Sequence, residues 1–167
     1  MICEIVPTTC PVRTNGFRIS EHIDAPAEPA WLHGLSRTGA VRVLVIEDFE
    51  PYRQFICSTL ARVRSLLVID EVSDGLEAVQ KAVELKPDLI LMDIGLPSLN
   101  GLEAARRILE LVPESKIIFL SQESSADVIK EALSLGARGY VVKARAGGEL
   151  LAAVDSVVLG KRFLSST

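Results

Sequence analysis

Residues 88–93, with the sequence Asp-Leu-Ile-Leu-Met-Asp, place four consecutive apolar residues between two acids. A run of this length without polar alternation is typical of a strand that is covered on both faces. Pro87 precedes the run and disfavours a continuous helix across this point. We therefore expect a central strand over residues 88–92, with Asp93 directly after its end.

Segments of strand length and helix length alternate on both sides of this run. Four further apolar runs predict strands at 41–46, 66–72, 116–120 and 139–142. Amphipathic segments predict five helices, at 51–63, 75–85, 100–112, 128–135 and 150–160. Asp74 and Asn100 stand where they can cap two of these helices. The alternation predicts an α/β, doubly wound fold whose five-stranded parallel sheet has the order 2-1-3-4-5.

Chemically active side chains follow four of the five predicted strands. Glu47 and Asp48 follow the first strand, Asp93 the third, Ser121 the fourth and Lys143 the fifth. In such a sheet the ligand crevice lies at the carboxyl ends of the strands, where the strand order reverses. We therefore expect these five side chains to meet at one edge of the sheet.

This combination predicts a metal-assisted phosphoryl site. Three carboxylates in one place repel one another, and a divalent cation relieves that repulsion. Ligation by oxygen alone favours Mg²⁺. A carboxylate can act as the nucleophile and form an aspartyl phosphate. An amine and a hydroxyl suit the phosphoryl oxygens.

Composition excludes several other classes of function. The 167 residues carry a net charge of −4, which argues against a broad nucleic-acid footprint. No run is long and apolar enough to span a membrane, and the N-terminus does not resemble a signal peptide. We expect a cytoplasmic protein that contacts neither membrane nor DNA. His22 and His33 lie outside the regular region, so a histidine-based hydrolase triad is not expected.

Three parts are predicted along the chain. Residues 1–39 hold four of the eight prolines and show no sustained periodicity, which predicts a mostly disordered N-terminal extension. A docking arm for a partner is the alternative for this segment. Residues 40–162 form the predicted domain, and residues 163–167 a short tail.

Several motifs together resemble the receiver domains of bacterial two-component response regulators. The resemblance covers about residues 41–160 and rests on residues 43–48, 91–101, 119–121 and 136–143. It implies the flavodoxin-like receiver fold. It also implies that Asp93 is the phosphoacceptor, and that a sensor histidine kinase or a phosphotransfer protein is the donor.

The resemblance assigns the other site residues as well. Asp48, Asp93 and the carbonyl of Gly95 would bind Mg²⁺ directly, and Glu47 would act through a metal-bound water.

Lys143 and Ser121 would contact the phosphoryl oxygens, and Tyr140 would be the aromatic switch residue. The output would pass through the face formed by the fourth helix, the fifth strand and the fifth helix, with homodimer formation as one outcome. No enzymatic activity is expected beyond the domain's own phosphotransfer and dephosphorylation.

Ala144 departs from the pattern of many receivers, which have proline after the lysine, so no cis peptide bond is expected there. This feature resembles NarL/FixJ-type receivers, which usually carry a C-terminal helix-turn-helix. The residues after Gly160 are too few for such a domain. A stand-alone receiver and the receiver part of a longer regulator both remain open.

Two other functions are alternatives to a phosphorylated receiver. The first is a pseudo-receiver that acts as an interaction module without phosphorylation. The second is a metal-dependent phosphohydrolase, which would need a further catalytic acid and a cap insertion over the site.

Overall fold

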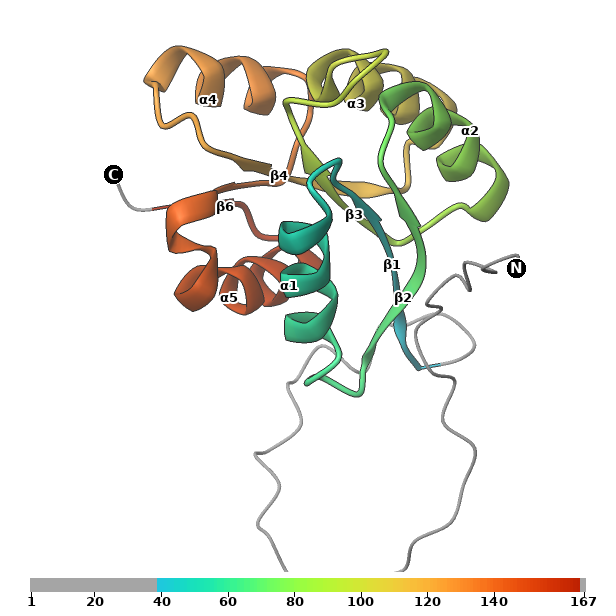
Figure 1. Cartoon of the computed structure of the whole chain (residues 1–167), viewed down its shortest axis with the longest axis vertical. Coiled ribbons are helices and arrows are strands. Elements are labelled where there is room, and N and C mark those ends of the chain that lie inside the picture. The colour runs from blue at the N-terminus through green and yellow to red at the C-terminus, as the bar shows by residue number, and fades with distance from the viewer. Residues whose placement is uncertain (1–38, 166–167) are drawn as a thin grey trace, which may run out of the picture.

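The structure, a computed structural model, describes residues 39–165 as alternating strands and helices (Figure 1). Nearly all of the predicted N-terminal extension lies outside these residues. The strands are β1 Val41–Ile46, β2 Leu66–Val72, β3 Leu89–Asp93, β4 Lys116–Ser121, β5 Gly139–Val142 and β6 Phe163–Leu164. The helices are α1 Glu50–Leu60, α2 Gly75–Leu85, α3 Gly101–Leu111, α4 Ala126–Ser134 and α5 Ala146–Val158, with a 3₁₀ turn, η2, at Lys143–Arg145.

The sheet is parallel throughout, with the strand order β2-β1-β3-β4-β5-β6. All five residues of β3 are buried, which fits a strand inside the sheet with helices over both faces. The predicted parallel α/β fold is confirmed, and so is the order of its first five strands. The expected number of five strands is wrong, because β6 adds a sixth.

β6 lies in the segment that the sequence analysis assigned to a tail. The N–H of Phe163 donates to the carbonyl of Arg138, and the N–H of Ser165 donates to the carbonyl of Tyr140. Without β6, the outer edge of β5 would expose unpaired backbone groups. A strand of two residues is too short to show a period of its own, and so the sequence pattern did not reveal it.

Helices cover the sheet on both faces (Figure 1). α1 and α5 pack on one face, through residues such as Ile56 and Val154. α2, α3 and α4 pack on the other face, through small residues such as Ala82 and Ala105. The sheet is therefore the middle layer of three, and the carboxyl ends of its strands share one edge.

Side-chain caps mark the starts of α2 and α3. Asp74 accepts hydrogen bonds from the N–H groups of Leu76 and Glu77, and Asn100 accepts one from Glu103. Both predicted caps are therefore confirmed. α1 ends at Leu60 rather than at residue 63 as predicted. As expected, no cis peptide bond occurs among residues 39–165.

Candidate functional site

The predicted site residues come together at the carboxyl ends of the strands. Asp93 and Ser121 are the last residues of β3 and β4, and Lys143 is the first residue after β5. Glu47 and Asp48 follow β1. With Gly95, these five side chains line one open cleft of about 560 Å³.

Lys143 joins two of the acids. Its Nζ lies 2.9 Å from Oε1 of Glu47 and 2.8 Å from Oε2. The same atom lies 3.1 Å from Oδ2 of Asp93. The three side chains are mostly buried, with exposed fractions of 11% for Lys143, 0% for Glu47 and 10% for Asp93. One ammonium therefore balances part of the charge of two carboxylates away from bulk water.

The acids form a cluster that suits a divalent cation. Glu47, Asp48 and Asp93 each offer an oxygen, and these oxygens all lie within 4.8 Å of one another. Oε2 of Glu47 is buried and has the ammonium of Lys143 at 2.8 Å as an ion-pair partner, although this contact lacks the geometry of a hydrogen bond. Burial raises the pKa of Glu47, and the negative charge of Asp93 adds to this, although the hydrogen bond from Lys143 acts the other way. The donor set is all oxygen, which is the preference of Mg²⁺.

The backbone fixes the carboxylate of Asp93. The N–H of Ile94 donates to its Oδ1 at 2.8 Å, so its Oδ2 is the oxygen that faces Lys143. The start of α3 returns to this point, because the N–H of Gly101 donates to the carbonyl of Ile94 at 2.8 Å. The carboxylate of Asp93 is thus held by the N–H of Ile94, and the start of α3 fixes the backbone of Ile94 in turn.

Ser121 and Tyr140 are connected through Glu123. The N–H of Glu123 donates to Oγ of Ser121 at 3.1 Å, and the hydroxyl of Tyr140 donates to the carbonyl of Glu123 at 2.8 Å. The ring of Tyr140 is fully buried, and this burial raises its pKa. Tyr140 therefore lies behind the cleft and reaches it through the loop after β4.

Three residues at the site were not predicted from the sequence, namely Phe49 just before α1 and Tyr52 and Arg53 within it. Phe49 and Tyr52 line the cleft, and Arg53 donates to the carbonyl of Glu47 at 2.6 Å. Tyr52 belongs to the amphipathic segment 51–63, for which the sequence predicted only a helix. The signal that could have found it is its place in the first turn after β1, which lies beside the carboxyl ends of the strands.

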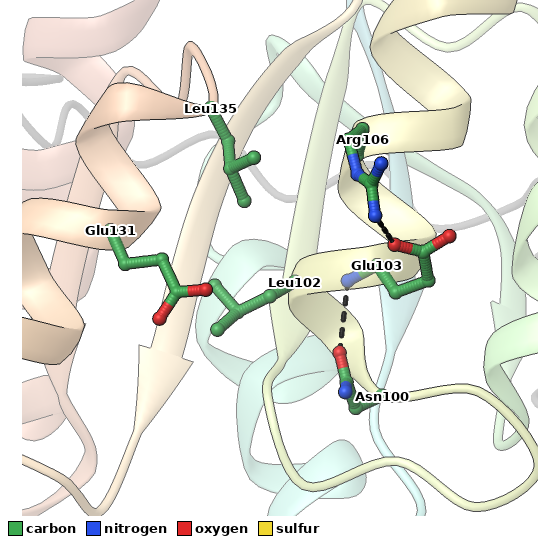
Figure 2. A pocket seen from close by; sticks show the side chains of 6 residues that line it. All are labelled: Asn100, Leu102, Glu103, Arg106, Glu131 and Leu135. Carbon is green, nitrogen blue, oxygen red and sulfur yellow. Dashed lines mark hydrogen bonds and ion pairs between the residues drawn. The ribbon is translucent and has the colours of Figure 1, made fainter.

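A second, smaller hollow of about 130 Å³ lies between α3 and α4, and none of the acids of the first cleft lines it (Figure 2). In Figure 2 the side chain of Arg106 points to Glu103, with which it forms an ion pair. Glu103 also pairs with Arg107 at 3.0 Å, and its pKa is lowered mainly by this contact. The charge of Glu103 is balanced by arginines of its own helix. The hollow therefore has no counterpart to the cluster of acids around Lys143 that lines the larger cleft.

Comparison with known proteins places this geometry in a family. Residues 43–155 match the response regulator receiver domain. This chain belongs to that family. The response regulator GacA of Pseudomonas viridiflava is 35% identical over 125 residues, which are 75% of this chain and 58% of that protein. The transcriptional regulatory protein LiaR of Bacillus subtilis is 35% identical over 126 residues, which are 75% of this chain and 60% of that protein.

Solved receiver structures have the same fold. The two-component response regulator of the LuxR family from Aurantimonas sp. SI85-9A1 matches with a TM-score of 0.73 at 28% identity, over 75% of this chain and 90% of that chain. The response regulator domain of Thermotoga maritima CheB matches with a TM-score of 0.67 at 33% identity, over 72% of this chain and 97% of that chain.

This chain is therefore the receiver domain of a response regulator from a two-component system. The receiver match spans less than two thirds of the curated relatives named above. Among residues 39–165, no helix of the receiver has the length and hydropathy to cross a membrane.

Proposed function

We propose that this receiver is a cytoplasmic switch that takes a phosphoryl group onto Asp93 from a sensor histidine kinase or a phosphotransfer protein. The observation that carries the proposal is the setting of Asp93. Its carboxylate ends the buried strand β3, lines an open cleft and lies 3.1 Å from the ammonium of Lys143. A nucleophile with a fixed positive charge beside it suits the transfer of an anionic group.

The proposed transfer exchanges one bond to phosphorus for another. A carboxylate oxygen of Asp93 forms the new P–O bond while the P–N bond to the donor histidine breaks. The histidine nitrogen keeps the electron pair and takes a proton from solvent. Lys143 then contacts one phosphoryl oxygen, and the hydroxyl of Ser121 donates to another. Lys143 needs only a small movement for this, because its ammonium already lies beside Asp93.

The acid cluster fits the Mg²⁺ ion that the family implies. Asp48, Asp93 and the carbonyl of Gly95 would bind the ion, and Glu47 would bind one of its waters. Oxygens of Glu47, Asp48 and Asp93 lie within 4.8 Å of one another, and Lys143 balances only part of their charge, which supports this assignment. When bound, the ion would balance the charge that the carboxylates share with the transferring phosphoryl group.

The proposed output passes through α4, β5 and α5. A phosphoryl group on Asp93 would attract Ser121, and Ser121 is linked to Tyr140 through the loop residue Glu123. Tyr140 lies on β5, so movement of Ser121 can bias the shape of this face. A changed face could recruit a partner protein or a second copy of the receiver.

The test uses the full chain, Mg²⁺ and phosphoramidate as a small-molecule phosphodonor. Intact-mass spectrometry should find one added phosphoryl group on the wild-type protein and none on Asp93→Asn. Asp127→Asn, which changes an exposed acid on α4, is the matched control and should be labelled like wild type. Labelling that persists in Asp93→Asn would contradict the proposal.

The pseudo-receiver alternative makes the opposite prediction. A module that acts without phosphorylation would bind no Mg²⁺ in a calorimetric titration and would gain no mass. The gathering of three acids and a lysine at one edge of the sheet favours the phosphorylated switch.

A further inference from the structure

Tyr52 lines the cleft, but it has no role in the proposed phosphoryl transfer to Asp93. It lies in the first turn of α1, where its side chain is half-buried and lines the cleft. Its ring packs beside Phe55, with 5.5 Å between the ring centroids. The ring is therefore held by the core on one side and faces the charged cluster on the other.

The ring of Tyr52 also contacts the ammonium of Lys143. Nζ lies 4.8 Å from the centre of the ring, which is within the range of a cation–π interaction. The same Nζ is in contact with Glu47 and Asp93. Three side chains thus hold the end of a long, flexible lysine side chain.

These three contacts differ in what phosphorylation would do to them. Asp93 would lose its carboxylate charge when it becomes an acyl phosphate, and Glu47 would be drawn toward the water shell of Mg²⁺. The ring of Tyr52 is neutral and takes part in neither change. It is the contact that can stay with Lys143 from the resting to the phosphorylated state.

We infer that Tyr52 is a positioning residue, whose ring keeps the Lys143 ammonium at the phosphoacceptor through a cation–π contact. The inference rests on the proposed function, since the positioned ammonium matters only if Asp93 is phosphorylated. The ring carries this role, and the hydroxyl does not. The hydroxyl is buried and makes no hydrogen bond with the described residues.

Two substitutions separate the ring from the hydroxyl. Tyr52→Phe keeps the ring and Tyr52→Leu removes it. Phe55→Leu is the matched control, because it removes a neighbouring ring of the same cluster that has no cation–π contact with Lys143. Circular dichroism shows whether each variant folds. Tyr52→Met, with a flexible side chain that fills irregular space, replaces the leucine variant if that one does not fold.

The first readout is independent of phosphorylation. An aromatic ring over the ammonium should shift the Hε protons of Lys143 upfield in NMR spectra, and these signals are assigned by their loss in Lys143→Arg. We expect the upfield shift in wild type, Tyr52→Phe and Phe55→Leu, and its loss in Tyr52→Leu. A shift that persists in Tyr52→Leu would overturn the inference, whether or not Asp93 is phosphorylated.

The second readout is the rate of Asp93 phosphorylation by phosphoramidate, measured at saturating Mg²⁺. Tyr52→Leu should be slower by several-fold, up to about tenfold, with Mg²⁺ affinity unchanged. Tyr52→Phe should match wild type. A wild-type rate in Tyr52→Leu, or an equal loss in Tyr52→Phe, would overturn the inference. If wild type itself is not labelled, the proposed function fails, and the NMR readout still tests the contact.

Discussion

Lys143 holds together two side chains that would otherwise repel each other. Its ammonium contacts the fully buried Glu47 and the mostly buried Asp93. Removing one partner of a buried ion pair leaves an uncompensated charge, which costs more than the pair itself contributes. Lys143 is thus a structural residue in the resting receiver as well as a proposed phosphoryl contact.

Lys143→Met should therefore destabilise the receiver by about 3 kcal/mol in chemical denaturation at neutral pH. The second substitution Glu47→Gln should restore part of this loss, because it removes the buried charge that Lys143 balanced. Lys130→Met, at an exposed lysine of α4, is the control and should change stability by less than about 0.5 kcal/mol. Wild-type stability in Lys143→Met would show that the buried carboxylates need no cation.

At the scale of the elements, the start of α3 is packed against the end of β3. A Cβ atom on Gly101 would lie 2.0 Å from the carbonyl oxygen of Asp93 and 2.8 Å from Cα of Ile94. Both are backbone atoms and cannot move alone. Glycine at this position is thus what lets α3 begin directly against the end of β3.

Gly101→Ala should destabilise the receiver by about 1–3 kcal/mol, since the backbone must shift to accept the methyl group. Gly148→Ala is the same substitution within α5, where a Cβ would meet nothing within 4 Å. That change should stabilise the receiver by about 0.5–1 kcal/mol, because alanine is the better helix former. Thermal and urea denaturation measure both, and equal effects at the two glycines would contradict the packing described here.

The cap of α2 should give stability a defined pH dependence. The pKa of Asp74 is lowered, first by the hydroxyl of Ser98 and then by the N–H groups at the start of the helix. The folded state therefore favours the ionised form more than the unfolded chain does. This stabilisation is present above the ordinary value of 3.8 and is lost as the pH falls through the lowered folded pKa.

Asp74→Asn tests this dependence, because asparagine also caps a helix and does not titrate. As the pH falls below 3.8, wild type should lose stability relative to the variant, and above that pH the difference should be constant. Urea denaturation across this range measures the difference. Parallel stability curves down to low pH would mean that the cap does not favour the charged form.

For the whole molecule, we expect the acid cluster to couple the proposed Mg²⁺ binding to folding. The three carboxylates are brought together only when β1 and β3 lie side by side, so a cation that binds them binds the folded state. Mg²⁺ at about 100 times its Kd should stabilise the receiver by about 2.7 kcal/mol and raise Tm by about 10 °C. EDTA should reverse the shift, and Asp48→Asn should abolish it. An equal shift in Asp48→Asn would place the ion elsewhere.

The sequence alone determined the parallel sheet, its first five strands and the edge where the site lies. The strands follow from hydrophobic periodicity, which is a local property of the chain. The position of the site follows from the rule that the carboxyl ends of parallel strands share one edge of the sheet. The grouping of Glu47, Asp93 and Lys143 could be predicted for this reason.

Only the tertiary structure decided β6 and the contact between Tyr52 and Lys143. The two residues of β6 are held by the open edge of β5, and they carry no local pattern strong enough to predict a strand. Tyr52 and Lys143 are far apart in the chain, and the period of α1 gives only the apolar face on which the tyrosine lies. Which charged group meets that face depends on where α1, which packs against β1 and β2, lies relative to the turn after β5. Packing between distant segments leaves no signature in a single sequence.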